Sequence, residues 1–186
     1  MSRSRPHVVA IALALAAEGA AVVCSDIHEA AREGGYERDI DIPTHEVIRK
    51  AGGRAEYLTA DAGKAADVEA LVAGAARSFG RLDIMVNNAG IFTGLHTILD
   101  ETEEQYDATM AINAKGVWLG CKYAIAQMMR QEPGAEGSRA ALASAFASCA
   151  GGEFWSSGPA EPWSFTIGSI SAPAGPGSGA RRALST

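Results

Sequence analysis

The stretch that decides the fold is Arg81-Leu82-Asp83-Ile84-Met85-Val86-Asn87-Asn88-Ala89-Gly90. Its apolar run, Leu82 to Val86, suits a short strand that is buried on both faces, as in a parallel sheet covered by helices. The run stops at two asparagines, and helical sequence lies on either side of it. Open α/β sheets bind their ligands at the carboxyl ends of such strands. Side-chain amides offer donors and acceptors there, and a glycine lets the backbone come close to a ligand.

Composition favours a single globular domain. The chain has 186 residues, of which 47% are hydrophobic and 20% charged, values that are ordinary for a protein with a sizeable core. The formal net charge is −6, and no basic cluster occurs. This acidic balance argues against nucleic acid and against an anionic membrane surface as partners.

The cysteines indicate a reducing, cytoplasmic setting. Cys24, Cys121 and Cys149 are odd in number and lie far apart in the sequence. Neither a disulfide framework nor a zinc site is therefore predicted, and no metal is expected.

The N-terminal region has two interpretations. Two arginines precede an apolar run from Val8 to Ala17, which is the pattern of a signal peptide. The alternative is a buried helix over 9–18 that ends at Gly19. We favour the helix because a plausible strand follows it directly, and because the run is too short to span a membrane.

Hydrophobic periodicity along the chain predicts an α/β fold with three layers. Strands are expected near 21–26, 55–60 and 82–86, and helices near 9–18, 44–51, 65–79 and 102–130. The strands near 21–26 and 55–60 are expected to be parallel neighbours.

Asn87-Asn88-Ala89-Gly90 after a strand, with Phe79-Gly80-Arg81-Leu82-Asp83 before it, strongly resembles the short-chain dehydrogenase/reductase family. The resemblance covers roughly Ala10 to Arg139. It implies a Rossmann-like fold and an NAD-dependent oxidoreductase that transfers a hydride between nicotinamide and a small secondary alcohol or carbonyl compound. We therefore expect a partial dinucleotide-binding domain over 1–139 and an irregular or disordered tail over 140–186.

The resemblance also implies a cofactor site. By position, Asp26 would bind the ribose hydroxyls of adenosine, because a carboxylate accepts two hydrogen bonds there and repels a 2′-phosphate. NAD is therefore expected in preference to NADP. Asp61 matches the family's acidic residue at the adenine amino group, and it also fits an N-cap for the following helix. The expected cofactor-binding residues are Asp26, Ile27, Asp61, Ala62, Asn87, Ala89 and Gly90.

Asn113 resembles the family's asparagine that kinks a helix and holds a water in the proton relay. Gly116 in the same motif indicates close packing or a local kink, because glycine is costly within a helix. Two residues, Ser148 and Ser169, are candidates for the catalytic serine, although each also fits a linker or an exposed position. In the family the helix corresponding to 102–130 packs against a neighbouring subunit, so a homo-oligomer through this helix is expected as an alternative role.

Two family motifs are missing from this sequence. Pro6 and Val8 stand where the family's phosphate-binding turn has glycine; proline lacks an amide proton, and valine adds a branched Cβ. No tyrosine is followed by lysine four residues later, so the pair that transfers the proton is missing. The family's first strand, which is central in its sheet, also has no counterpart. We therefore expect an incomplete sheet, with the first and C-terminal strands missing or altered.

Two hypotheses stay open. The first is an NAD-dependent oxidoreductase that is impaired in this chain. The second is a non-catalytic fragment that binds a nucleotide or mediates oligomerisation.

Overall fold

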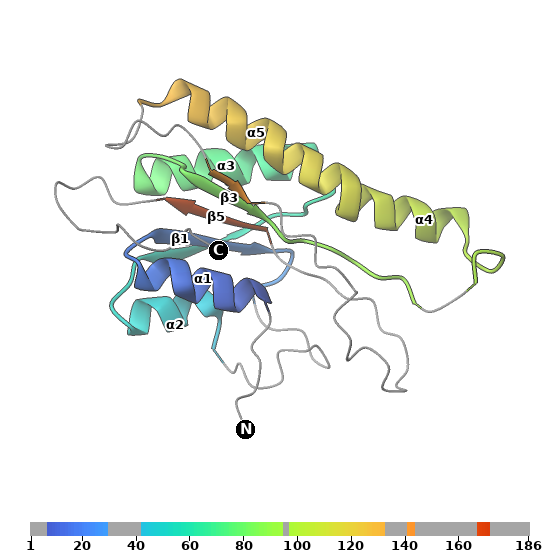
Figure 1. The fold of residues 1–186 in the computed structure, drawn as a ribbon, viewed down its shortest axis with the longest axis horizontal. Coiled ribbons are helices and arrows are strands. Elements are labelled where there is room, and N and C mark those ends of the chain that lie inside the picture. The colour runs from blue at the N-terminus through green and yellow to red at the C-terminus, as the bar shows by residue number, and fades with distance from the viewer. Residues whose placement is uncertain (1–6, 30–41, 95–96, 133–140, 144–166, 172–186) are drawn as a thin grey trace, which may run out of the picture.

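The protein consists of a five-stranded sheet between two layers of helices. A computed structural model of the chain describes residues 7–29, 42–94, 97–132, 141–143 and 167–171. Helices α1 (His7–Ala17) and α2 (Thr44–Lys50) cover one face of the sheet, and α3 (Ala65–Phe79) and α5 (Val117–Arg130) cover the other. Figure 1 shows these layers below and above the strands. The predicted three-layer, Rossmann-like α/β architecture is confirmed.

The strand order of the sheet is β2-β1-β5-β3-β4. The strands are β1 (Ala21–Asp26), β2 (Ala55–Thr59), β3 (Ile84–Asn87), β4 (Ala141–Ala143) and β5 (Ile167–Ser171). β1 and β2 are parallel neighbours, as predicted, and β3 and β4 are also parallel.

β5 departs from the sequence-based expectation. The tail over 140–186 was expected to be irregular, and the slot between β1 and β3 was expected to lack a strand. Instead β5 fills this slot and runs antiparallel to both neighbours, with Ser169 opposite Val23 and Met85. In Figure 1 the β5 arrow points against those of β1 and β3. The open backbone edges of β1 and β3 need hydrogen-bond partners, and a strand of either direction can supply them.

Each face of the sheet has its own hydrophobic core. On one face Val68, Leu71 and Val72 of α3 pack with Met85 of β3, which is fully buried. Gly80 ends α3 with a φ of 82°, a left-handed conformation that favours glycine. On the other face Ala12, Val22 and Ile48 form the core.

The N-terminal apolar run forms α1, in which Val9 and Ala12 are buried. This is the helix that the sequence favours, although it begins at His7. Within the described ranges, no helix has the length and apolar character needed to cross a membrane.

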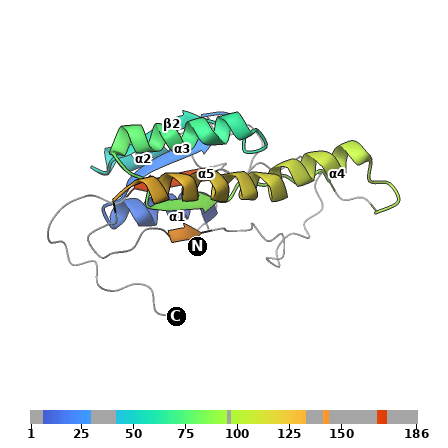
Figure 2. The ribbon, with the colours of Figure 1, turned by 90° about the horizontal axis from the view of Figure 1, so that it is seen from above.

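A long helical rod completes the fold. It consists of α4 (Glu103–Met110), the π-helix η1 (Ala111–Gly116) and α5, and Figure 2 shows α4 extending beyond the sheet. The predicted capping box is present: Gln105 N donates to Thr102 Oγ1 (3.3 Å), and Thr102 N donates to Gln105 Oε1 (2.9 Å). The predicted helix over 102–130 is therefore one continuous rod, with the π-helix around Asn113.

Candidate functional site

The candidate site lies along the carboxyl edge of the parallel strands. β1 and β2 end side by side, because Asp26 pairs with Thr59 and Ala60 N donates to the Asp26 carbonyl oxygen (3.1 Å). β3 ends at the same edge, since Ile167 of β5 pairs with both Ser25 of β1 and Asn87 of β3. The topology therefore brings the ends of these three strands to one side of the sheet, as the sequence predicts.

Asp26 is the last residue of β1 and is held by its neighbours. Ile27 N donates to Asp26 Oδ1 (2.6 Å), and Tyr57 Oη donates to the Asp26 carbonyl oxygen (2.7 Å). Burial is the main reason that the pKa of Tyr57 is raised, so this phenol stays a hydrogen-bond donor at neutral pH. Ile27 is largely exposed beside the carboxylate. The arrangement fixes the end of β1 in one position.

A second carboxylate follows Asp26 and was not found from the sequence. Glu29 Oε1 lies 3.3 Å from Nε2 of His45, which is buried in α2. The His45 ring also lies against the Tyr57 ring, with centroids 5.8 Å apart. His45 thus ties the segment after β1 to α2. No sequence signal indicated this pair, since the two residues belong to no motif.

Asp61 organises the turn between β2 and α3. Its Oδ1 accepts a hydrogen bond from Gly63 N (2.9 Å), and its Oδ2 lies 3.1 Å from Lys64 Nζ. The hydrogen bond to Asp61 raises the pKa of Lys64. The N-cap position of α3 is Lys64, so the alternative interpretation of Asp61 as that N-cap is wrong. Instead, Asp67 in the first turn of α3 accepts a hydrogen bond from Asp61 N (3.1 Å).

The turn after β2 packs closely on the π-helix. A Cβ added to Gly116 would lie 3.1 Å from the Ala62 carbonyl oxygen, and one added to Gly63 would lie 2.9 Å from Ile112 Cδ1. At Gly116 the obstacle is a backbone oxygen, so glycine suits this close approach, whereas the end of the Ile112 side chain beside Gly63 could shift. The close packing that the sequence predicts at Gly116 is therefore present, and Ala62 is its contact.

The two asparagines at the end of β3 are buried: Asn87 is its last residue, and Asn88 follows it. Asn87 and Asn88 are each 2% exposed. Asn87 Nδ2 lies 3.5 Å from Cys121 Sγ of α5, and a Cβ added to Gly120 would collide with Asn87 Oδ1. Asn88 Nδ2 is buried and makes no hydrogen bond within the described part of the chain. Ala89 packs against the hydrophobic core to which α5 contributes, so the loop after β3 contacts α5 through this core.

Asn113 holds the loop after β3 to the π-helix. Ile91 N donates to Asn113 Oδ1 (2.8 Å), and Asn113 Nδ2 donates to the Ile91 carbonyl oxygen (2.9 Å). The side-chain amide therefore satisfies both backbone groups of one residue. These contacts do not test the separate expectation that Asn113 binds a water molecule of the proton relay.

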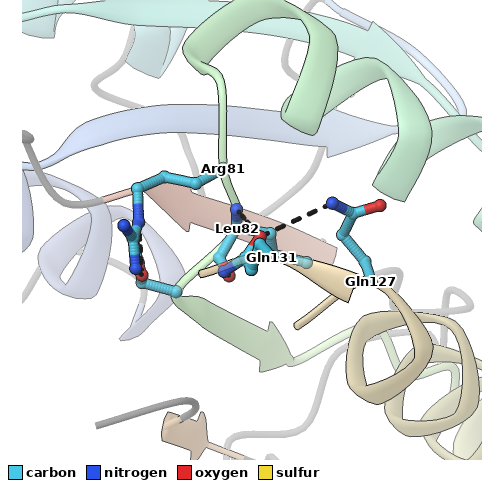
Figure 3. Close-up of polar contacts among 5 residues, drawn as sticks. Arg81, Leu82, Gln127 and Gln131 are labelled. Atoms are coloured by element: carbon cyan, nitrogen blue, oxygen red, sulfur yellow. Dashed lines mark hydrogen bonds and ion pairs between the residues drawn. The ribbon is translucent and has the colours of Figure 1, made fainter. Parts of the chain in front are cut away.

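Gln131 makes the same kind of contact at the other end of β3. Leu82 N donates to Gln131 Oε1 (3.0 Å), and Gln131 Nε2 donates to the Leu82 carbonyl oxygen. Figure 3 shows Gln131 reaching Leu82, with Gln127 also directed at the Gln131 amide. Two amides from one helical rod thus hold the backbone on both sides of β3. The sequence carried no signal for Gln131, because a lone glutamine after a helix is ordinary.

We expect Asn113→Asp to destabilise the protein by about 1–3 kcal/mol, because a carboxylate cannot donate to the Ile91 carbonyl oxygen and leaves it unsatisfied. Gln131→Glu is the matched variant at Leu82 and should lose stability for the same reason. Urea unfolding of the three proteins measures the effect. An Asn113→Asp protein as stable as the unchanged chain would show that these contacts contribute nothing.

The two candidates for the catalytic serine have different outcomes. Ser148 lies outside the described residues. Ser169 pairs with Val23 and Met85 in the middle of the sheet. Among the described tyrosines, Tyr57 binds the end of β1, and Tyr106 lies exposed on α4.

The edge fits only part of a dinucleotide. Asp26 and the turn at Asp61 lie at the β1–β2 end, where an adenosine would need a carboxylate for its ribose. A diphosphate would have to cross the centre of the edge, where Ile167 of β5 pairs with Ser25 and Asn87. The residues present therefore suit the adenosine half and do not suit the diphosphate.

Comparisons with known proteins agree with this architecture. The family model described as enoyl-(acyl carrier protein) reductase matches residues 9–158. An uncharacterised oxidoreductase of Thermotoga maritima is 42% identical over 123 residues, which is 66% of this chain and 44% of the relative. Glucose 1-dehydrogenase 2 of Bacillus subtilis is 38% identical over 88 residues, or 47% of this chain and 34% of the relative.

A solved structure gives the same result. A short-chain dehydrogenase/reductase from Burkholderia xenovorans superimposes with a TM-score of 0.62 at 28% identity, covering 77% of this chain and 51% of that one. The chain spans less than half the length of the curated relatives named above. Fold, strand-end loops and sequence all lead to one conclusion: the chain belongs to the short-chain dehydrogenase/reductase family of oxidoreductases.

Proposed function

We propose that this chain is the nucleotide-binding part of an NAD-dependent short-chain oxidoreductase and that its own hydride-transfer activity is impaired. The observation that carries the proposal is Asp26 at the end of β1, beside the Asp61 turn and at the same edge as the loop from Asn87 to Gly90. The ligand expected there is the adenosine part of NAD.

Charge supports NAD over NADP. Asp26 ends β1, and Glu29, held by His45, follows in the same segment. Two carboxylates at this position would repel the 2′-phosphate of NADP. The other proposed cofactor-binding residues are Ile27, Asp61, Ala62, Asn87, Ala89 and Gly90.

The residues of this chain would mainly bind the cofactor and position the loop after β3. When bound, nicotinamide would supply the hydride acceptor or donor for an alcohol or carbonyl compound. Asn113 would hold the loop after β3 through the backbone of Ile91. Ser148 is the proposed polar group near the substrate. The cysteine pattern supports a cytoplasmic setting, where Cys24 and Cys121 stay as free thiols.

Asp26→Asn tests the proposal. We expect the affinity for NAD to fall about 10–100-fold, because a hydrogen bond to a charged acceptor contributes about 1.5–3 kcal/mol. Discrimination against NADP should weaken as well. Calorimetric titration with both nucleotides measures these changes, and Glu69→Gln is the control, since it removes one exposed negative charge on α3.

The unchanged chain should bind NAD weakly. An affinity for NAD tighter than about micromolar, or a preference for NADP, would contradict the proposal.

A specific observation also favours the alternative, a non-catalytic role in oligomerisation. The rod carries exposed apolar side chains along its length, namely Tyr106, Met110, Trp118, Ile125 and Met129. Such a row is typical of a surface that a second helix covers. We propose a second copy of this chain as the partner, in line with the expected packing of this helix across a dimer. We expect sedimentation of the unchanged chain to show a dimer, and we expect Trp118→Glu to convert this dimer to a monomer. A monomeric unchanged chain would contradict the proposed dimer.

A further inference from the structure

β5 crosses the candidate site at its centre. Its first residue, Ile167, is the register partner of Ser25 in β1 and of Asn87 in β3. Ser25 directly precedes Asp26, and Asn87 begins the loop that runs to Gly90. The N-terminal end of β5 therefore lies between two groups of proposed cofactor-binding residues, Asp26 on one side and the loop that ends at Gly90 on the other.

The direction of β5 determines whether a phosphate-binding turn can follow the strand at the centre of the carboxyl edge. A parallel strand would end at the carboxyl edge and could turn there into a phosphate-binding loop and helix. β5 is antiparallel, so the polypeptide enters the strand at this edge and leaves it at Ser171, opposite Ala21 at the far side of the sheet. The centre of the edge is then the first residue of a strand, so a phosphate-binding turn cannot follow the end of β5 there.

We propose that β5 divides the carboxyl edge, so that the site accepts an adenosine mononucleotide but does not accept a dinucleotide across β5. This inference rests on the proposed adenosine site at Asp26. It changes the class of ligand, because a dinucleotide could not reach Asp26 and the loop that ends at Gly90 at the same time. The inference also gives β5 a role, because this strand would limit the size of the nucleotide that the site accepts.

The position of β5 can be tested with a native cysteine. Cys24 is the register partner of Gly168, and directly paired residues of antiparallel strands have Cα atoms about 4.5–5.5 Å apart, within the range that a disulfide spans. Gly168→Cys should therefore form a disulfide with Cys24. Ser169→Cys is the matched control, because position 169 pairs with Val23 and Met85.

The oxidation needs suitable conditions. Burial raises the pKa of the Cys24 thiol to about 11, so copper–phenanthroline at alkaline pH is the appropriate oxidant. Peptide mapping should find the link from 24 to 168, and Cys24→Ser should abolish it. If the link fails to form in folded Gly168→Cys protein, β5 does not occupy the slot and the inference is wrong.

Gly168→Cys could prevent folding, so a second measurement uses the unchanged chain. Hydrogen exchange followed by mass spectrometry compares residues 167–171 with β1. We expect similar protection, because both would be central strands of one sheet. Exchange of 167–171 at the rate of an unstructured peptide would overturn the inference.

Calorimetry of the full chain with AMP and with NAD tests the ligand class. We expect the two dissociation constants to agree within about tenfold, since a diphosphate that is not held by a phosphate-binding turn adds little affinity. If NAD binds more than about tenfold tighter than AMP, β5 does not divide the site, although the proposed nucleotide function stands. If neither ligand binds, the proposed function fails, and the mononucleotide site fails with it.

Discussion

The purified chain is expected to show no measurable oxidation of secondary alcohols with NAD. The sequence has no tyrosine followed four residues later by lysine, and the family's proton transfer depends on such a pair. General acid–base catalysis is typically worth about 10²–10⁴-fold in rate. The reversed β5 would also misplace the nicotinamide, which removes the benefit of orientation. The measurement is NADH absorbance with a panel of sugars, secondary alcohols and steroids.

Asn113→Ala is the control for this experiment. If the unchanged chain does turn over a substrate and Asn113→Ala abolishes the rate, the expectation is wrong and another residue supplies the proton. Ser148, Ser169 and Lys115 would be the first positions to replace. A rate that survives Asn113→Ala would instead indicate a contaminating dehydrogenase.

Gly120→Ala is expected to destabilise the protein by about 1–3 kcal/mol, as overpacked buried sites do. The new Cβ would collide with Asn87 Oδ1, and it would lie 2.9 Å from Asn87 Cγ and 3.1 Å from Met85 Cε. Asn87 is a short, buried side chain and has little room to move. Alanine stabilises a helix interior by about 1 kcal/mol relative to glycine. Net destabilisation therefore requires that the steric strain exceed this gain. Urea unfolding measures the net change.

Two further variants separate strain from other effects. Gly74→Ala is the matched control in α3, where the new Cβ would meet Leu58 Cδ1 at 2.7 Å; this methyl group lies at the end of a flexible side chain and can shift. Gly120→Ala combined with Asn87→Ala removes the obstructing amide. The pair should be less destabilising than the sum of the single changes by about 0.5–3 kcal/mol. Strict additivity would show that Asn87 is not the obstacle.

Local signals in the sequence predicted most of the fold. The capping box at Thr102 and the glycines that end helices, such as Gly80, act within a few residues, so they can be recognised without the rest of the protein. The continuous apolar runs of β1 and β3 also predict buried strands. The parallel pairing of β1 with β2 then followed from the family resemblance, and the structure confirms it.

Contacts between distant residues could not be predicted in this way. The short stretch that forms β5 has no clear period, and its direction depends on two open strand edges elsewhere in the chain. The pair of His45 with Glu29 and the contact of Gln131 with Leu82 likewise join residues that share no motif. At the candidate site, the sequence indicated that Asp26 and Asp61 follow the ends of strands, and the structure has them there. Their role in binding a cofactor stays a prediction, and the sequence did not indicate that β5 lies between β1 and β3.

The late position of β5 in the sequence affects how the protein folds during its synthesis. Its partners in β1 and β3 are translated long before residues 167–171 leave the ribosome. Until then, the two facing edges of the sheet have no partner from β5, and each can pair with strands of other nascent chains. Pairing across almost the whole chain also slows folding, because the loop must close before the contacts form. Folding of this protein is therefore completed only after translation of its C-terminal region, and chaperones that shield open strand edges should increase its soluble yield.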